Sequence, residues 1–70
     1  MKLTEQEKEL ILAYAKNDMN AKETEREHFM AIGGFRYHAK KIKEKTGLSP
    51  FRFYDLVELL KEAKGEVCDD

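Results

Sequence analysis

Apolar and polar positions in this chain recur with the period of an α-helix. The apolar positions of the first segment share one stripe: Leu3, Leu10, Ile11 and Tyr14. The run TEQE from Thr4 to Glu7 is a capping box, in which the threonine hydroxyl accepts from the Glu7 amide and the Glu7 carboxylate accepts from the Thr4 amide. The pattern therefore predicts a helix that is capped by Thr4 and runs to about Lys16, where NDMN interrupts it.

Two further helices are predicted in the middle of the chain. Asn20 with Glu23 repeats the capping pattern and predicts a short helix from Ala21 to about His28 or Phe29. The next helix is expected from Gly33 or Gly34 to Lys45, with Thr46-Gly47 ending it because glycine accepts a left-handed turn. Its inward positions follow i, i+4, i+7 spacing: Phe35, Ala39 and Ile42.

The last helix is predicted to open at Ser49-Pro50, with Ser49 as the cap and Pro50 in the first helical position, and to run to about Lys64. Its expected apolar stripe is Phe53, Leu56, Val57 and Leu60. The chain is thus predicted to form a compact all-α domain of about four short helices over residues 1–64, followed by a frayed acidic tail over residues 65–70.

The stretch MAIGGFRY allows a second interpretation. A Gly-Gly pair between alternating apolar residues is typical of a tight β-hairpin, with strands at Phe29–Ile32 and Phe35–His38. The HAKKIKEK that follows favours helix, and an isolated two-stranded hairpin is marginally stable. We therefore favour the helix.

Size and composition restrict the class of protein. A chain of 70 residues with 41% hydrophobic and 39% charged positions is too short for a large substrate cleft, too apolar for a disordered tail and too charged for a membrane protein. We expect a soluble, cytoplasmic protein, because no apolar block has the length of a signal peptide or membrane span. Its single cysteine, Cys68, provides no disulfide framework.

Charge is distributed unevenly. Residues 29–50 contain five Lys or Arg and one Glu, a balance of +4, whereas residues 1–28 have five basic against seven acidic residues and residues 51–70 have three against six. The formal net charge of −1 conceals this basic segment. Such a polarised chain presents either a polyanion-binding face or a solvated helix face.

The sequence contains no motif that is specific for catalysis or for metal binding. Glu25-x-x-His28 is spaced like half of a dimetal carboxylate site, but such sites need a second copy from another helix. His38 has no nucleophile near it in the sequence, and Gly-Gly alone is not a phosphate-binding loop. We expect no enzyme activity, no cofactor and no metal.

A helix of about eight residues, a turn of about four and a more basic helix form the expected layout of a helix-turn-helix, in which the second helix lies in the DNA major groove. From Ile11 to Leu60 the chain resembles the C-terminal helix-turn-helix of the PucR family of bacterial transcription regulators, and small stand-alone phage and Firmicutes proteins with that module. The resemblance is carried by Ala13-Tyr14, Asn20, Thr24, Arg36-Tyr37, Lys40-Lys41-Ile42 and the block KTGLSPFRFYDLVELL from Lys45 to Leu60. It implies a homeodomain-like or Fis-like fold and a small transcription regulator.

The chain departs from the family pattern at the start of its basic helix. Ala31, Ile32, Gly33 and Gly34 occupy the places where the family has HRNT. Glu25 and His28 replace a small Ala and a Leu on the inner face of the preceding helix, and Ala39 replaces a Leu. Burial of Glu25 or His28 would require hydrogen-bond partners. The paired glycines represent either lost contacts or places where backbone approaches phosphate closely.

Two functions of different classes follow from these observations. The first is a DNA-binding regulator that works as a homodimer, partly through the FRFY segment with Leu59 and Leu60, although core packing is the commoner use of such residues. Its expected DNA contacts are Arg36, His38, Lys40, Lys41 and Lys43. The alternative is a helix-turn-helix relic that binds a protein partner through the apolar pair Ala31-Ile32.

Overall fold

The computed structural model describes residues 3–64 and has four helices there, with no strand in that range. They are α1 (Glu5–Lys16), α2 (Ala21–Glu27), α3 (Gly34–Thr46) and α4 (Phe53–Lys64). The all-α prediction is confirmed and the hairpin interpretation is wrong. The acidic tail and its cysteine lie outside the described residues. Over the described part of the chain, no helix combines the length and apolar character needed to cross a membrane.

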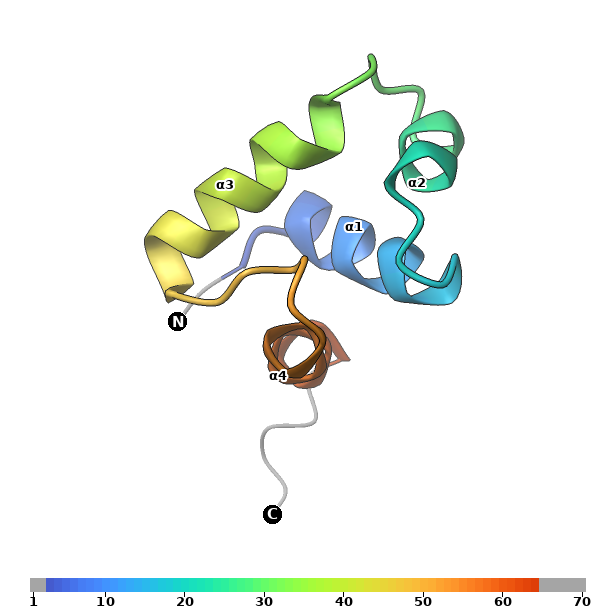
Figure 1. Ribbon diagram of the computed structural model, residues 1–70. Coiled ribbons are helices and arrows are strands. Elements are labelled where there is room, and N and C mark those ends of the chain that lie inside the picture. Colours follow the sequence, from blue (N-terminus) through green and yellow to red (C-terminus); the bar gives the residue numbers. More distant parts are fainter. Residues whose placement is uncertain (1–2, 65–70) are drawn as a thin grey trace.

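Helix α1 occupies the centre of the arrangement and contacts each of the other three helices. In Figure 1, α3 and α2 lie above α1, and α4 is seen end-on below it. Helices α2 and α3 also contact each other, whereas α4 packs on α1 rather than on α3. This arrangement leaves the side of α3 that faces away from α1 open to solvent.

The core lies where α1 meets α3 and α4. Its buried apolar residues are Leu3, Leu10, Ile11, Tyr14, Phe35, Ala39, Ile42, Leu56 and Leu59. The rings of Tyr14 and Phe35 stack with centroids 4.4 Å apart, and Phe51 meets both rings edge-on. These aromatic contacts join α1, α3 and the segment before α4, and aromatic pairs of this geometry stabilise a core beyond their buried area.

The N-terminal caps of α1 and α2 and the C-terminal cap of α3 follow the sequence pattern. The Thr4 hydroxyl accepts from the Glu7 amide at 3.1 Å, and the Thr4 amide donates to the Glu7 carboxylate at 2.9 Å. Asn20 Oδ1 accepts from the Glu23 amide at 3.1 Å, as predicted for the start of α2. Gly47, with φ of +79°, ends α3 in the left-handed conformation that glycine adopts without strain.

Helix α4 begins later than predicted, so the expectation of Ser49 as cap and Pro50 as first helical residue is wrong. Residues 49–52 instead form a turn in which the Arg52 amide donates to the Ser49 carbonyl at 3.1 Å. The Ser49 hydroxyl accepts from the Phe51 amide at 3.3 Å, within that turn. The physical reason is tertiary: Pro50 is fully buried and Phe51 packs on the aromatic core, so the chain is anchored before the helix starts.

The apolar face of α4 is also rotated from the predicted stripe. Leu56 and Leu59 are buried, Val57 and Leu60 are half-buried, and Phe53 is 62% exposed. The prediction of Phe53 as part of the buried stripe is therefore wrong, since Phe53 is the first residue of α4 and lies outside the buried core. Leu59 belongs to the core, which leaves it no part in an interface with another molecule.

Candidate nucleic-acid interface

The start of α3 is held by a side chain from α2. Glu25 is only 7% exposed, and its Oε2 accepts hydrogen bonds from the amides of Gly33 and Phe35, both at 3.1 Å. These amides belong to the first turn of α3, where helical N–H groups lack partners within the helix and the helix dipole favours a negative charge. Glu25 therefore caps α3, which supplies the hydrogen bonds that its burial requires. His28 is half-buried and caps the C-terminus of α2 with its backbone.

The two glycines before α3 have conformational roles. Gly33 has φ of +89°, a left-handed value at which any other L-residue is strained, although no atom lies within 4 Å of a Cβ added there. At Gly34 an added Cβ would lie 3.1–3.2 Å from side-chain atoms of Met30. The pair therefore lets the chain turn tightly into α3 beneath Met30, which explains its presence without any contact to another molecule.

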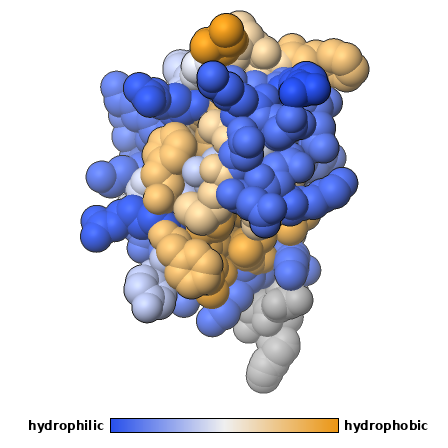
Figure 2. Space-filling view, turned by 45° about the vertical axis from the view of Figure 1, so that its right-hand side comes forward, coloured by the Kyte–Doolittle hydropathy of each residue, from blue (hydrophilic) through white to orange (hydrophobic). Residues whose placement is uncertain are grey.

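Two large apolar side chains stand on the turn between α2 and α3. Phe29 is 96% exposed and Ile32 is 94% exposed. In Figure 2 apolar atoms gather at the top of the view, where Figure 1 places this turn. The backbone is nevertheless well fixed, since the Met30 amide donates to the Glu25 carbonyl at 2.8 Å and the Gly34 amide to the Ala31 carbonyl at 2.9 Å. The turn thus displays apolar side chains from an ordered backbone.

The solvent side of α3 carries a row of cations. Arg36, Lys40 and Lys43 are exposed, while Phe35, Ala39 and Ile42 on the same helix are buried. The prediction that the cations share an exposed face while the apolar residues turn inward is confirmed, although the cations flank the buried stripe rather than lying directly opposite it. None of the three cations belongs to an ion pair among the residues that the structure describes. Their charges are therefore available to a ligand.

Three neighbouring residues widen this basic face. The Lys41 ammonium lies 5.3 Å from the centre of the Tyr37 ring, a cation–π distance. The Tyr37 ring meets the His38 ring edge-on at 5.4 Å, and His38 is half-buried. Of the five expected DNA contacts, four are thus exposed and His38 lies partly covered beside Tyr37. Sequence analysis did not select Tyr37 as a contact, although its i, i+4 spacing to Lys41 was visible there.

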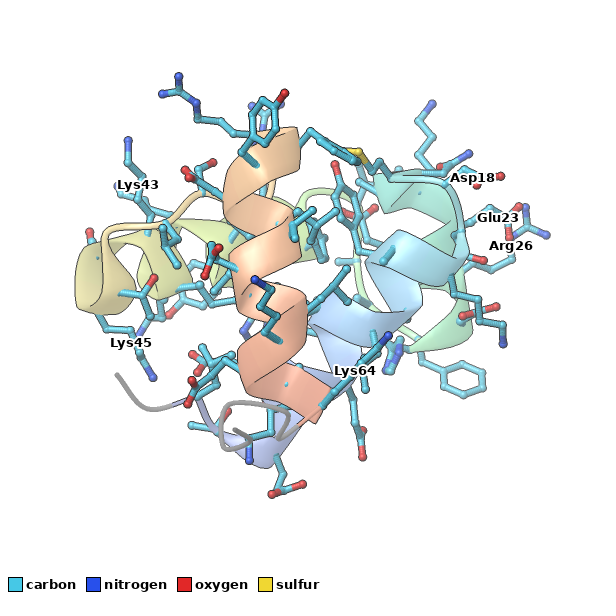
Figure 3. The ribbon with its side chains drawn as sticks, turned by 90° about the horizontal axis from the view of Figure 1, so that it is seen from below. Asp18, Glu23, Arg26, Lys43, Lys45 and Lys64 are labelled. Atoms are coloured by element: carbon cyan, nitrogen blue, oxygen red, sulfur yellow. The ribbon has the colours of Figure 1, made fainter. Side chains whose placement is uncertain are left out.

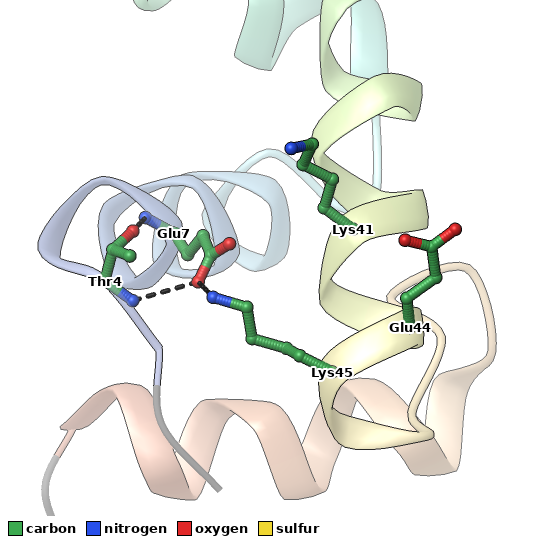
Figure 4. Close-up of a pocket in the computed structure, with 5 residues that line it drawn as sticks. All are labelled: Thr4, Glu7, Lys41, Glu44 and Lys45. Carbon is green, nitrogen blue, oxygen red and sulfur yellow. Dashed lines mark hydrogen bonds and ion pairs between the residues drawn. The ribbon is translucent and has the colours of Figure 1, made fainter.

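Lys45 of α3 forms an ion pair with another helix of the same chain. Its ammonium lies 2.9 Å from Oε1 of the buried Glu7, and Figure 4 shows the pair beside Thr4 at the edge of a shallow pocket. Burial alone would raise the pKa of Glu7, but the hydrogen bonds from Lys45 and from Thr4, with the charge of Lys45, together lower it below its ordinary value. Lys43 and Lys45 project from opposite sides of α3 in Figure 3.

The acidic and histidine side chains do not assemble into a metal site within residues 3–64. No three His, Cys, Asp or Glu side chains of that range come together closely enough to hold an ion. Glu25 instead uses one carboxylate oxygen to accept from the amides of Gly33 and Phe35, and His28 takes no part in that cap.

Comparisons of the chain with models of protein families, with curated proteins and with solved structures find no match.

Proposed function

We propose that this protein binds duplex DNA through the exposed basic face of α3 and acts as a small transcription regulator of the helix-turn-helix type. The observation that carries the proposal is the row formed by Arg36, Lys40 and Lys43. These cations lie on one exposed face of α3, beside its buried stripe, and make no ion pair with any described side chain. Lys41 extends the same face toward Tyr37.

The order and exposure of the elements support a groove-binding role for α3. It follows the short helix α2 after a six-residue turn, and the cap from Glu25 joins the two helices across that turn. A helix presented in this way fits the width of the major groove, with its cations directed at the phosphates on either side. Arg36, in the first turn of α3, is the side chain suited to donate two hydrogen bonds to guanine.

The experiment is a fluorescence-anisotropy titration of a labelled duplex of about 20 base pairs at about 50 and about 200 mM salt. The unmodified protein should bind, and log affinity should fall linearly with log salt. Replacing Lys40 and Lys43 together by Ala should weaken binding to all sequences alike and reduce the salt slope by about two. Arg36→Ala should change sequence preference instead.

A matched control is available on α4. Lys61 and Lys64 have the same i, i+3 spacing as Lys40 and Lys43, and α4 packs on α1 rather than on α3. Replacing Lys61 and Lys64 by Ala removes the same charge and should leave the salt slope nearly unchanged. Equal losses from both double variants would mean that net charge alone governs binding, which would contradict a specific role for α3.

Homodimerisation belongs to this proposal, because two copies can occupy successive major grooves about 34 Å apart and a single small module binds weakly. The face that supports it is a largely apolar hollow between the end of α1 and α4, lined by Ala15, Asp18, Met19, Phe53, Leu56, Val57 and Leu60. Sedimentation velocity with and without DNA tests the point, with Cys68 kept reduced so that a disulfide does not mimic a dimer. A purely monomeric species in both conditions would exclude it.

A second candidate function is protein binding without DNA binding. It is favoured by Phe29 and Ile32, two large apolar side chains that are almost fully exposed. Apolar and aromatic anchors of this kind supply much of the energy of protein interfaces. The same titration separates the two functions, since a failure to bind duplex DNA at about 50 mM salt would leave the protein-binding role.

A further inference from the structure

A small hollow opens beside the start of α3, between α2, α3 and the segment that precedes α4. Its apolar walls come from Ala21, Ile32 and Phe51, and Lys22 and Arg36 stand at its rim. Ile32 and Phe51 are exposed, so these walls meet solvent in the free protein. The hollow is therefore an apolar surface bordered by two cations.

The acidic residue that lines this hollow, Glu25, repels an anionic ligand only weakly. Oε2 of its carboxylate is bound to the amides of Gly33 and Phe35, and the side chain is nearly covered. Its charge faces the positive end of the α3 dipole. The charges that meet an approaching ligand are then those of Lys22 and Arg36, which favours an occupant that combines an apolar group with nearby negative charge.

Arg36 connects the hollow with the basic face of α3. It belongs both to the rim of the hollow and to the row that continues through Lys40 and Lys43. A duplex whose phosphates contact that row brings the edges of its bases toward the start of α3. The apolar group that a base edge presents in the major groove is the 5-methyl group of thymine.

We propose that Ile32 and the hollow beside it bind thymine methyl groups in the major groove, so that Ile32 determines a preference for thymine at the position facing the start of α3. This inference rests on the proposed DNA-binding function. Ala31, Ile32 and two glycines precede α3, and none of these residues has a side chain that can form a hydrogen bond with a base edge. Apolar contact with the methyl group replaces hydrogen bonding as the means of discrimination.

The experiment compares an alternating A·T duplex with the same duplex in which uracil replaces thymine, because uracil differs from thymine by the methyl group alone. Fluorescence anisotropy should show binding that is about three- to fourfold weaker for each buried methyl group that is lost. An alternating G·C duplex with and without 5-methylcytosine supplies the complementary test, since the added methyl group lies at the same place in the groove. Methylation should strengthen binding by a similar factor.

Ile32→Ser should abolish both methyl effects and lower the affinity for the thymine duplex to that for the uracil duplex, while the salt slope stays unchanged because no cation is removed. Phe29→Ser is the matched control, because Phe29 is as exposed as Ile32 and stands on the same turn but does not line the hollow. The control should keep the full methyl effects. Circular dichroism verifies that both variants are folded, which their exposed positions favour.

Each other outcome overturns the inference. Equal binding of thymine and uracil duplexes, still weakened by the Lys40 and Lys43 double variant, would refute methyl recognition and leave the proposed function standing. Binding of neither duplex would refute both. If neither duplex binds and a labelled helical peptide of Glu and Leu residues binds in an Ile32-dependent manner, the hollow takes an acidic protein segment instead.

Discussion

Replacement of Glu25 by Ala should destabilise the protein strongly, although the residue is charged and belongs to no ion pair among the described residues. The substitution leaves the amides of Gly33 and Phe35 without their acceptor. The Phe35 bond is buried and the Gly33 bond is partly buried, so water can replace the acceptor more easily at Gly33. An unsatisfied buried donor costs about 1–3 kcal/mol, and we expect a total loss of about 2–3 kcal/mol.

This loss is a large fraction of the whole, because a chain of 70 residues has a free energy of unfolding of roughly 4–10 kcal/mol. Glu25→Gln keeps an acceptor oxygen and the shape of the side chain but loses the charge that faces the helix dipole, so it should cost about 1 kcal/mol. Glu27→Ala on the same helix is the control, and we expect a loss below about 0.5 kcal/mol there because Glu27 is exposed.

Urea unfolding followed by circular dichroism measures these differences, and hydrogen exchange at the Phe35 amide measures the local effect. In the Glu25→Ala variant this amide should exchange faster relative to the amides of α1. If Glu25→Ala costs no more than Glu27→Ala, the carboxylate does not hold the start of α3 in solution. Equal costs for Glu25→Ala and Glu25→Gln would show that the charge, rather than the presence of an acceptor, carries the effect.

Three further predictions concern single positions. Thr4→Ala should cost about 1 kcal/mol in urea unfolding, because the Glu7 amide loses its hydroxyl acceptor, and no change would exclude the cap. Because the pKa of Glu7 is lowered from its ordinary value of 4.5, the ionised carboxylate stabilises the folded state above pH 4.5, and this stabilisation is lost as pH falls through the folded pKa. The difference in unfolding free energy between the protein and Glu7→Gln should therefore shrink on acidification from neutral pH. A constant difference would contradict this. Phe29→Asn should raise the free energy of unfolding by about 0.5–1 kcal/mol. Phe29 is 96% exposed and has a φ of +56°, a conformation that asparagine tolerates better. A loss of stability would show that the aromatic ring makes contacts.

Local sequence determined the parts of this protein that depend on nearest neighbours along the chain. The capping box at Thr4 and the cap at Asn20 satisfy amides three residues away, so their chemistry is complete within one helical turn. The division of α3 into a buried stripe and an exposed basic face follows from its 3.6-residue period, which keeps Arg36, Lys40 and Lys43 off the stripe of Phe35, Ala39 and Ile42.

Only the tertiary structure decided features that join distant segments. The cap of α3 by Glu25 crosses eight to ten residues and a turn, so it depends on how α2 meets α3 and not on any local motif. Spacing could not show that Lys45 is bound to Glu7, 38 residues away, while Lys43 stays free of ion pairs among the described residues. Burial of Pro50 and the edge-on contacts of the Phe51 ring with the aromatic core delay the start of α4 to Phe53, so these tertiary contacts outweigh the local capping signal at Ser49.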